Sequence, residues 1–197
     1  MTAEEGLNKF IDLLQREKYV KVLDIGCGTS KVHTKVMQDQ GLSVSTCDIF
    51  KGVDYQGDYN QLKNLPVFEG IWASHILEHQ LNVNKFLKKI HSDLIEQGYL
   101  CITVPPLKHQ IVGGHVTLWN AGLLIYNLVL AGFDCSSIKV KQYGYNISII
   151  LQKKSILKMP QLTYDTDDLT ILKEYFPAFK CSNYNSFNGN ITEYNWL

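Results

Sequence analysis

The stretch VKVLDIGCGTS, residues 20–30, constrains the fold of this chain more than any other segment. Its apolar first half suits a buried strand, while Gly26 and Gly28 suit a tight turn that another group approaches closely. Val32 and Val36 follow four residues apart, which predicts a helix that places both valines against a sheet. A strand, a glycine turn and a helix in this order predict a nucleotide site, because the N–H groups and dipole of the helix point into the turn.

The residues of the turn decide between kinds of nucleotide site. A dinucleotide site of the form G-x-G-x-x-G needs a third glycine where Lys31 stands, and the phosphate-loop pattern G-x-x-x-x-G-K-S/T is absent. Asp24, Gly26 and Gly28 instead match the motif D/E-x-G-x-G-x-G, with Ser30 in place of the last glycine. The segment thus resembles the first motif of class I S-adenosylmethionine-dependent methyltransferases. The resemblance implies that the methionyl ammonium of S-adenosylmethionine is attracted to Asp24, directly or through water, whereas a pyrophosphate would be repelled.

Later segments resemble the same family in the same order. A second strand-like run, residues 43–47, ends at Asp48, where related folds hydrogen-bond ribose hydroxyls. Asp58 and Tyr59 resemble the family's third element, in which a carboxylate accepts from the adenine amino group and its neighbour packs on the ring. We therefore expect Asp48, Asp58 and Tyr59 to bind the cofactor.

A fourth strand is predicted over residues 71–76, and the following LEH resembles the sequence after that strand in many small-molecule methyltransferases. Ser74 and His75 lie at its carboxyl end and are expected to face the cofactor. Cys27, inside the glycine turn, is either a reactive thiol or a small residue that faces the cofactor. The chain has five cysteines and no C-x-x-C, which fits a reduced compartment.

The remaining periodicity completes an α/β fold. It predicts a helix that is capped by Asn82 and ends at Gly98, a strand over residues 99–104, a helix over 118–131, and a hairpin of residues 138–143 and 147–151. The resemblance implies that these elements form a doubly wound, Rossmann-like, seven-stranded and mostly parallel sheet with an antiparallel final hairpin, which the family adds.

Residues 1–154 are expected to form the S-adenosylmethionine-binding core and residues 155–197 a C-terminal extension packed on it. The extension contains a predicted short helix over 166–176 and an asparagine-rich run with aromatic residues at Tyr184, Phe187, Tyr194 and Trp196. Amides and aromatic rings suit hydroxyl-rich ligands, so contact with an acceptor is the alternative to a packed extension.

The sequence from His75 to His79 also matches H-x-x-E-H, the inverted zinc-protease pattern. That chemistry needs both histidines on one helix, whereas the residues before His75 suit a strand. We therefore expect no metal, and we expect His79 to hold a backbone carbonyl.

The acceptor is expected to lie beside residues 107–120, LKHQIVGGHVTLWN, since the family places acceptor-facing residues after the fifth strand. A hydroxyl acceptor must lose a proton, and histidine is the usual base near neutral pH. His115 follows a flexible glycine pair and is the first candidate for the base or for acceptor contact, with His109 second. Packing at the start of the next helix is an equal alternative for His115.

Composition limits the kinds of molecule that this chain is expected to bind. The 19 Lys and Arg residues equal the 19 Asp and Glu residues, which gives no general attraction to nucleic acid or to an anionic membrane. The start of the chain carries acidic residues and no apolar signal segment, so a cytoplasmic location is expected. We expect a methyltransferase that acts on a small polar acceptor, by O-methylation of a sugar, sugar nucleotide or related metabolite. The alternatives are N-methylation of a small amine or protein side chain, and a cofactor-binding module without catalysis.

Overall fold

The computed structural model describes residues 3–178 and 186–197. Its strands are β1 (Lys21–Ile25), β2 (Ser43–Asp48), β3 (Tyr55–Gln56), β4 (Phe68–Ser74), β5 (Leu94–Val104), β6 (Lys139–Tyr143), β7 (Asn146–Gln152) and β8 (Glu193–Tyr194). Its α-helices are α1 (Glu4–Arg16), α2 (Val32–Asp39), α3 (Val83–Asp93), α4 (Ala121–Leu130) and α5 (Asp168–Ile171), and Leu77–His79 and Lys173–Tyr175 form 3-10 turns.

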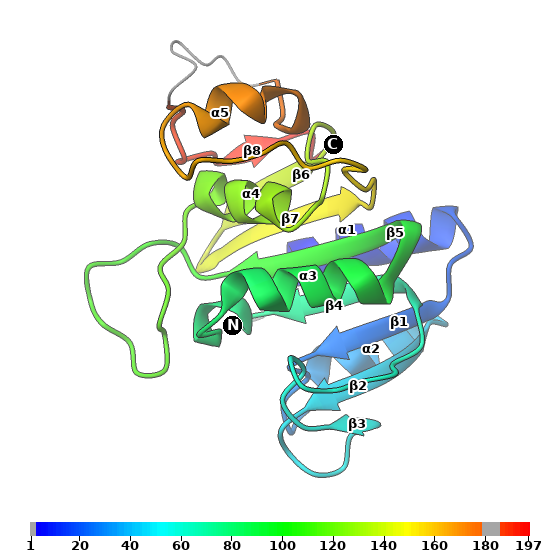
Figure 1. Ribbon diagram of the computed structural model, residues 1–197. Helices are drawn as coiled ribbons and strands as arrows, with labels where there is room; N and C mark the ends of the chain where they lie inside the picture. Colours follow the sequence, from blue (N-terminus) through cyan, green and yellow to red (C-terminus); the bar gives the residue numbers. More distant parts are fainter. Residues whose placement is uncertain (1–2, 179–185) are drawn as a thin grey trace.

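Within the described residues the strands form one open sheet in the order β3-β2-β1-β4-β5-β7-β6-β8 (Figure 1). Strands β1 to β5 are parallel, and β7, β6 and β8 continue the sheet with antiparallel pairings. The expected mostly parallel Rossmann-like sheet with an antiparallel final hairpin is confirmed. The described sheet has eight strands instead of the expected seven. The sequence patterns showed neither β3 nor β8, each only two residues long, and β8 comes from the C-terminal extension.

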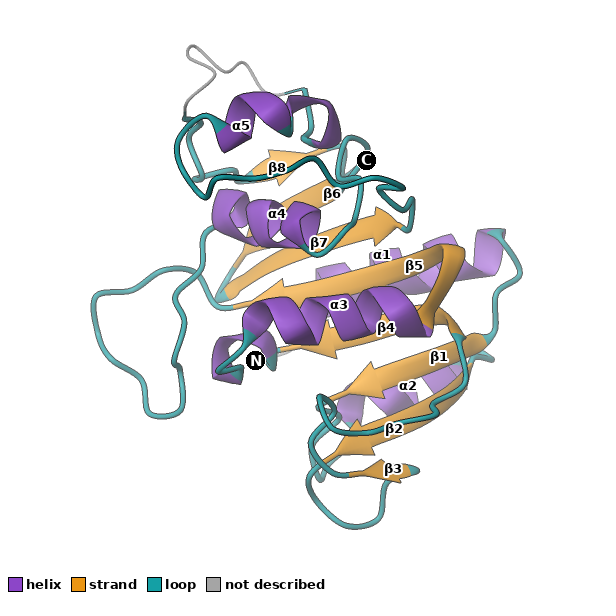
Figure 2. Ribbon diagram, in the orientation of Figure 1, coloured by secondary structure: helices purple, strands orange, loops and turns teal. Residues whose placement is uncertain are grey.

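Helices cover both faces of the sheet (Figure 2). Helices α3 and α4 pack on one face with the larger apolar core, and α1 and α2 lie on the other. The apolar residues of α1 pack against β5 and β7. The first element of the fold therefore lies before residues 20–30, the first segment that the motifs identified. None of the described helices is long and apolar enough to cross a membrane.

The buried face of α2 differs from the expectation. The helix forms where predicted, but Val32 and Val36 are 46% and 36% exposed, whereas Thr34 and Met37 are buried. The reason is that polar groups beneath the helix need partners: Thr34 bonds to Asp24, and His33 accepts a hydrogen bond from the Trp72 indole at 3.2 Å. Spacing alone therefore identified the helix and misassigned its inner face.

The boundary between α3 and β5 also corrects a prediction. Asn82 caps α3 through its side chain, which accepts from the Lys85 N–H at 3.0 Å, but the helix ends at Asp93 and not at Gly98. Gly98 instead lies inside β5, beside an irregularity in the pairing with β4. An added Cβ there would meet the Glu69 carbonyl oxygen at 2.8 Å, so glycine serves close strand packing rather than helix termination.

Other boundaries shift by a few residues. Strand β4 spans Phe68–Ser74 instead of residues 71–76, and α4 starts at Ala121, after the Asn120 cap, instead of at residue 118. The predicted helix over 166–176 is divided into α5 and the turn Lys173–Tyr175. Tyr184 lies outside the described residues, so its expected role stays a prediction.

The extension after residue 154 lies against the antiparallel half of the sheet. Strand β8 pairs with β6, Trp196 is buried in the apolar core on the α1 face, and Gly122 of α4 donates its N–H to the Gly189 carbonyl at 3.0 Å. These contacts support the division into a core over 1–154 and a packed extension over 155–197, which we keep as a proposal.

Candidate functional site

Two adjoining cavities lie at the carboxyl ends of β1, β2 and β4. The large cavity, of about 770 Å³, is lined among others by Gly28, Asp48, Asp58, Tyr59 and Ile76. The small cavity, of about 460 Å³, is lined by residues of the glycine turn, of α2, of residues 74–79 and of two later loops: Gly26, Cys27, Ser30, Val32, His33, Ser74, His75, Glu78, His79, His115 and Tyr145. Gly26, His75 and His79 belong to both linings, so ligands in the two cavities would meet there.

The glycine turn requires its glycines. Gly26 and Gly28 have φ angles of +74° and +64°, in the region that disfavours residues with a Cβ. A Cβ on Gly26 would press on the Ile76 side chain at 3.1 Å, whereas a Cβ on Gly28 would meet no atom of the described chain within 4 Å. Because Gly28 lines the large cavity, a side chain there would project into space that a ligand can occupy.

Asp48 is held at the rim of the large cavity by the turn itself. Its carboxylate accepts the Gly28 N–H at 2.8 Å and the Phe50 N–H at 3.3 Å. These bonds fix the carboxylate at the tip of β2, where the sequence predicted a ribose contact. A lone pair on either oxygen remains for a ligand hydroxyl.

Asp24 lies outside the lining of both cavities. Its side chain is buried and accepts the Thr34 hydroxyl at 2.5 Å. Burial raises the pKa of Asp24 to about 7, with the Thr34 hydrogen bond opposing that shift and the Asp48 charge adding to it. The carboxylate thus lies behind the turn and does not reach either cavity directly. The expected contact with a methionyl ammonium through water stays a prediction.

Asp58 and Tyr59 line the large cavity with different surroundings. Asp58 accepts the Asn60 N–H at 2.9 Å and the Gln61 amide at 3.0 Å, which orients its carboxylate on the exposed side. Tyr59 is only 5% exposed and donates its hydroxyl to Asp93 at 2.7 Å. Tyr59 therefore lines the cavity and anchors its wall to α3.

Cys27 and Ser74 belong to the small cavity. Burial, with the charges of Asp24 and Asp48, raises the pKa of the Cys27 thiol to about 11, so a reactive thiolate is disfavoured at neutral pH. This favours the alternative of a small residue that faces a ligand. The Ser74 hydroxyl is buried and has no hydrogen-bond partner within residues 3–178 and 186–197, which leaves it available to a ligand.

His75 sits at the junction of the two cavities with a φ angle of +51°, an unusual conformation for a residue with a side chain. Its Nδ1 lies 3.2 Å from Glu78 Oε1, and its Nε2 lies 2.8 Å from Asn146 Oδ1. Burial lowers the pKa of His75, but both hydrogen bonds and the Glu78 charge outweigh burial and raise it above its ordinary value. The ring also stacks on Tyr145, with centroids 6.3 Å apart.

The loop after β5, which extends away from the sheet in Figure 1, brings His115 to this junction. The Glu78 carbonyl accepts the Val116 N–H at 2.9 Å and anchors the loop. His79 Nδ1 lies 2.8 Å from the Gly114 carbonyl oxygen, as expected for a histidine that holds a backbone carbonyl. The rings of His79 and His115 lie 5.0 Å apart and nearly perpendicular.

His109 lies on the exposed part of the same loop, outside the lining of both cavities. The structure therefore brings His115, but not His109, to the junction. It also adds Glu78, His33 and Tyr145, which the motif analysis had not assigned to the site. Their participation depends on contacts between distant segments, for which the local sequence gives no signal.

The H-x-x-E-H segment does not form a single helix. His75 follows the end of β4, and Leu77–His79 form one 3-10 turn. This confirms the expectation that the segment starts at a strand tip, and it excludes the helical geometry of the inverted zinc-protease pattern.

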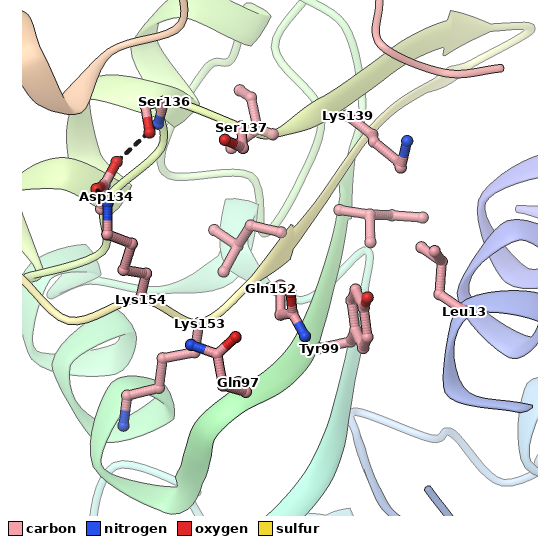
Figure 3. A pocket seen from close by; sticks show the side chains of 13 residues that line it. Leu13, Gln97, Tyr99, Asp134, Ser136, Ser137, Lys139, Gln152, Lys153 and Lys154 are labelled. Atoms are coloured by element: carbon pink, nitrogen blue, oxygen red, sulfur yellow. Dashed lines mark hydrogen bonds and ion pairs between the residues drawn. The ribbon is translucent and has the colours of Figure 1, made fainter. Parts of the chain in front are cut away.

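A further cavity, of about 280 Å³, lies at the opposite end of the sheet (Figure 3). It is lined by the start of β5 and the end of β7, and Asp134 there pairs with Lys154 at 2.6 Å and with the Ser136 N–H at 2.9 Å. Lys139 and Lys153, which also line it, donate to backbone carbonyl oxygens. The cavity is remote from the glycine turn. We therefore place the functional site at the two cavities.

Comparisons with known proteins agree with the fold described above. Residues 3–142 match a family described as a methyltransferase domain. A 1,6-didemethyltoxoflavin-N1-methyltransferase of Burkholderia thailandensis is 17% identical, with a TM-score of 0.62 over 77% of this chain and 79% of that one. An S-adenosylmethionine-dependent methyltransferase of Clostridium acetobutylicum is 11% identical, with a TM-score of 0.60 over 79% of this chain and 93% of that one.

Human N-acetylserotonin methyltransferase, solved in complex with S-adenosylmethionine, has a TM-score of 0.59 and is 14% identical over 76% of this chain and 52% of that one. A comparison with curated protein sequences finds no significant match. At these identities the solved structures establish the fold, while the family match covers most of the chain. The chain belongs to the methyltransferase domain family.

Proposed function

We propose that this methyltransferase transfers the methyl group of S-adenosylmethionine to a hydroxyl group of a small polar acceptor, such as a sugar or a related metabolite. The observation that carries the proposal is the pair of cavities that share Gly26, His75 and His79. Methyl transfer needs a donor and an acceptor in contact, with bulk water kept out. Two cavities that meet at one junction would bring donor and acceptor into contact.

The residues that line the large cavity offer hydrogen-bonding groups suited to S-adenosylmethionine. Gly28 leaves open space beside the backbone, Asp48 presents a carboxylate for ribose hydroxyls, and Asp58 presents one for the adenine amino group. Asp24 supplies negative charge behind the turn, where water can relay it to an ammonium. When bound, the cofactor supplies an electrophilic methyl group on a sulfonium.

The small cavity supports the acceptor class. The Tyr145 ring lines this cavity, with the His75 ring stacked on it and the Lys108 ammonium 3.9 Å from its centroid. The Ser74 hydroxyl and the His115 imidazole offer hydrogen bonds to the same space. Hydrogen-bonding groups in the wall of a cavity suit the hydroxyl groups of a sugar. In this proposal His115 contacts the acceptor hydroxyl or accepts its proton.

An acceptor screen tests the proposal. Purified protein with methyl-labelled S-adenosylmethionine is expected to label hydroxylated metabolites, including sugar nucleotides, and to produce S-adenosylhomocysteine in equal amount. Mass spectrometry of the product identifies the methylated atom. Labelling of amines alone would replace the proposal with N-methylation. Tight binding of S-adenosylhomocysteine without labelling of any acceptor would favour a non-catalytic module.

The raised pKa of Asp24 predicts a pH dependence of cofactor affinity. Below about pH 7 the Asp24 carboxyl is protonated in the free protein, and above it the carboxylate attracts the ligand ammonium. We expect the affinity for S-adenosylhomocysteine, measured by calorimetry, to rise several-fold from about pH 6 to about pH 7.5, below the range in which an amino group loses its proton. Asp24→Asn should flatten this profile. A flat profile in the unmodified protein would contradict the role of Asp24.

A further inference from the structure

We propose that Glu78, His79 and His115 bind one divalent transition-metal ion at the wall of the small cavity, where the ion would hold an oxygen atom of the acceptor. The metal-binding part stands on the geometry of these three residues alone. The role toward the acceptor rests on the proposed function. The proposal departs from the sequence-based expectation that the chain holds no metal.

The three side chains converge from separate segments. Glu78 and His79 come from the turn after β4, and His115 comes from the loop after β5. One ligand atom from each side chain lies within 4.8 Å of the other two. Small side-chain rotations bring such atoms to the distances of about 2.0–2.2 Å that imidazole nitrogen and carboxylate oxygen keep from zinc.

Glu78 carries a polar atom that a cation would satisfy. Its side chain is fully buried, and its Oε2 has no hydrogen-bond partner in the described parts of the chain. Its Oε1 interacts with His75 at 3.2 Å and lies 4.0 Å from His79 Nε2. A buried carboxylate oxygen without a partner is costly, and such groups are rare in folded proteins. A metal ion between Glu78 and the two other histidines removes that cost.

His79 is oriented as a metal ligand. Since a carbonyl oxygen only accepts hydrogen bonds, the contact between His79 Nδ1 and the Gly114 carbonyl places the proton on Nδ1. The lone pair is then on Nε2, the nitrogen near Glu78. Metal-binding histidines are commonly fixed in this way, by donating the other ring N–H to a backbone carbonyl.

The ligand set selects the kind of ion. Two imidazoles and one carboxylate suit zinc, iron, cobalt and manganese better than calcium, which prefers oxygen ligands. Three protein ligands would leave coordination positions open, as in catalytic rather than structural sites, and all three residues line the small cavity. His75 is not part of the set, because its ring nitrogens contact Glu78 and Asn146. The site therefore differs from the inverted zinc-protease pattern, which pairs His75 with His79.

Cobalt(II) titration tests the site without cofactor or acceptor. Tag-free protein is treated with a chelator, dialysed and titrated with Co²⁺ while visible absorption and calorimetry are recorded. We expect one ion per chain, with the absorption of a four- or five-coordinate centre. His79→Ala and Glu78→Gln should each weaken Co²⁺ binding by about tenfold or more, while His109→Ala, an exposed histidine of the same loop, should leave it unchanged.

Binding of S-adenosylhomocysteine to each variant separates the two proposals. Unchanged affinity in Glu78→Gln, whose residue lines only the small cavity of the two, would show that lost cobalt binding is not a loss of fold. If the unmodified protein binds S-adenosylhomocysteine but no Co²⁺, or if both variants bind Co²⁺ normally, the metal site is overturned. If Co²⁺ binds as expected but S-adenosylhomocysteine does not, the proposed function fails and the metal site stands.

Discussion

Replacing Gly28 with leucine is expected to weaken S-adenosylhomocysteine binding by more than about 100-fold, or more than about 2.8 kcal/mol, as measured by calorimetry. Gly28 lines the large cavity, and a side chain there meets only the space that the cofactor would fill. The substitution also places a Cβ at a φ angle of +64°, which costs about 1–2 kcal/mol of folding stability. Binding should therefore fall far more than stability does.

Gly41→Leu is the matched control. Gly41 has a φ angle of +86° and, like Gly28, open space around a Cβ within the described chain, but it lies in the turn after α2, away from both cavities. Both variants should lose similar thermal stability, and only Gly28→Leu should lose binding. Equal cofactor affinity in the two variants would show that the cofactor does not lie against the glycine turn.

Replacing His115 with alanine is expected to lower turnover by about 100-fold or more on an identified acceptor, while the affinity for S-adenosylhomocysteine stays nearly unchanged. His115 lines only the small cavity of the two, so its removal affects the acceptor side of the junction. The loss is expected whether the imidazole accepts the acceptor proton or binds an ion that holds the acceptor oxygen. Initial rates at saturating cofactor give the measurement.

His109→Ala provides the comparison for this variant, because His109 lies on the same loop, exposed and outside both linings. It should retain the turnover of the unmodified enzyme. Full activity in His115→Ala would remove His115 from the reaction, and a larger loss in His109→Ala would transfer the proposed role to that residue.

The parallel half of the sheet could be predicted because its signals are local. Strands β1, β4 and β5 each carry an apolar run, and the turn after β1 carries glycines at the positions where φ is positive. Strand β3 has only two residues and carries no such signal. The N-terminal helix α1 was missed because the motifs begin at β1, although its apolar residues repeat at helical spacing. Gly98 was misassigned because glycine ends a helix and also permits close strand packing, and only the neighbouring Glu69 carbonyl distinguishes the two.

The candidate site was predicted unevenly for a related reason. Gly28, Asp48 and Asp58 were identified from short motifs, and the structure places all three on one cavity. The grouping of Glu78 and His79 with His115 depends on how the loop after β5 folds back, since these residues are more than thirty positions apart in the chain. The spacing of residues along the sequence does not show that this loop lies against the turn after β4.

The short outermost strands have a consequence for how the protein behaves at high concentration. An open sheet ends in rows of unpaired N–H and C=O groups, and a long row of this kind recruits strands from other molecules into aggregates. Here the outermost strands, β3 and β8, are two residues long, while the strands beneath them, β2 and β6, have six and five. Strand β8 of the C-terminal extension thus covers part of the edge of β6 and is itself too short to pair with a strand of another molecule. Resistance to aggregation therefore depends on residues that are remote from the candidate site.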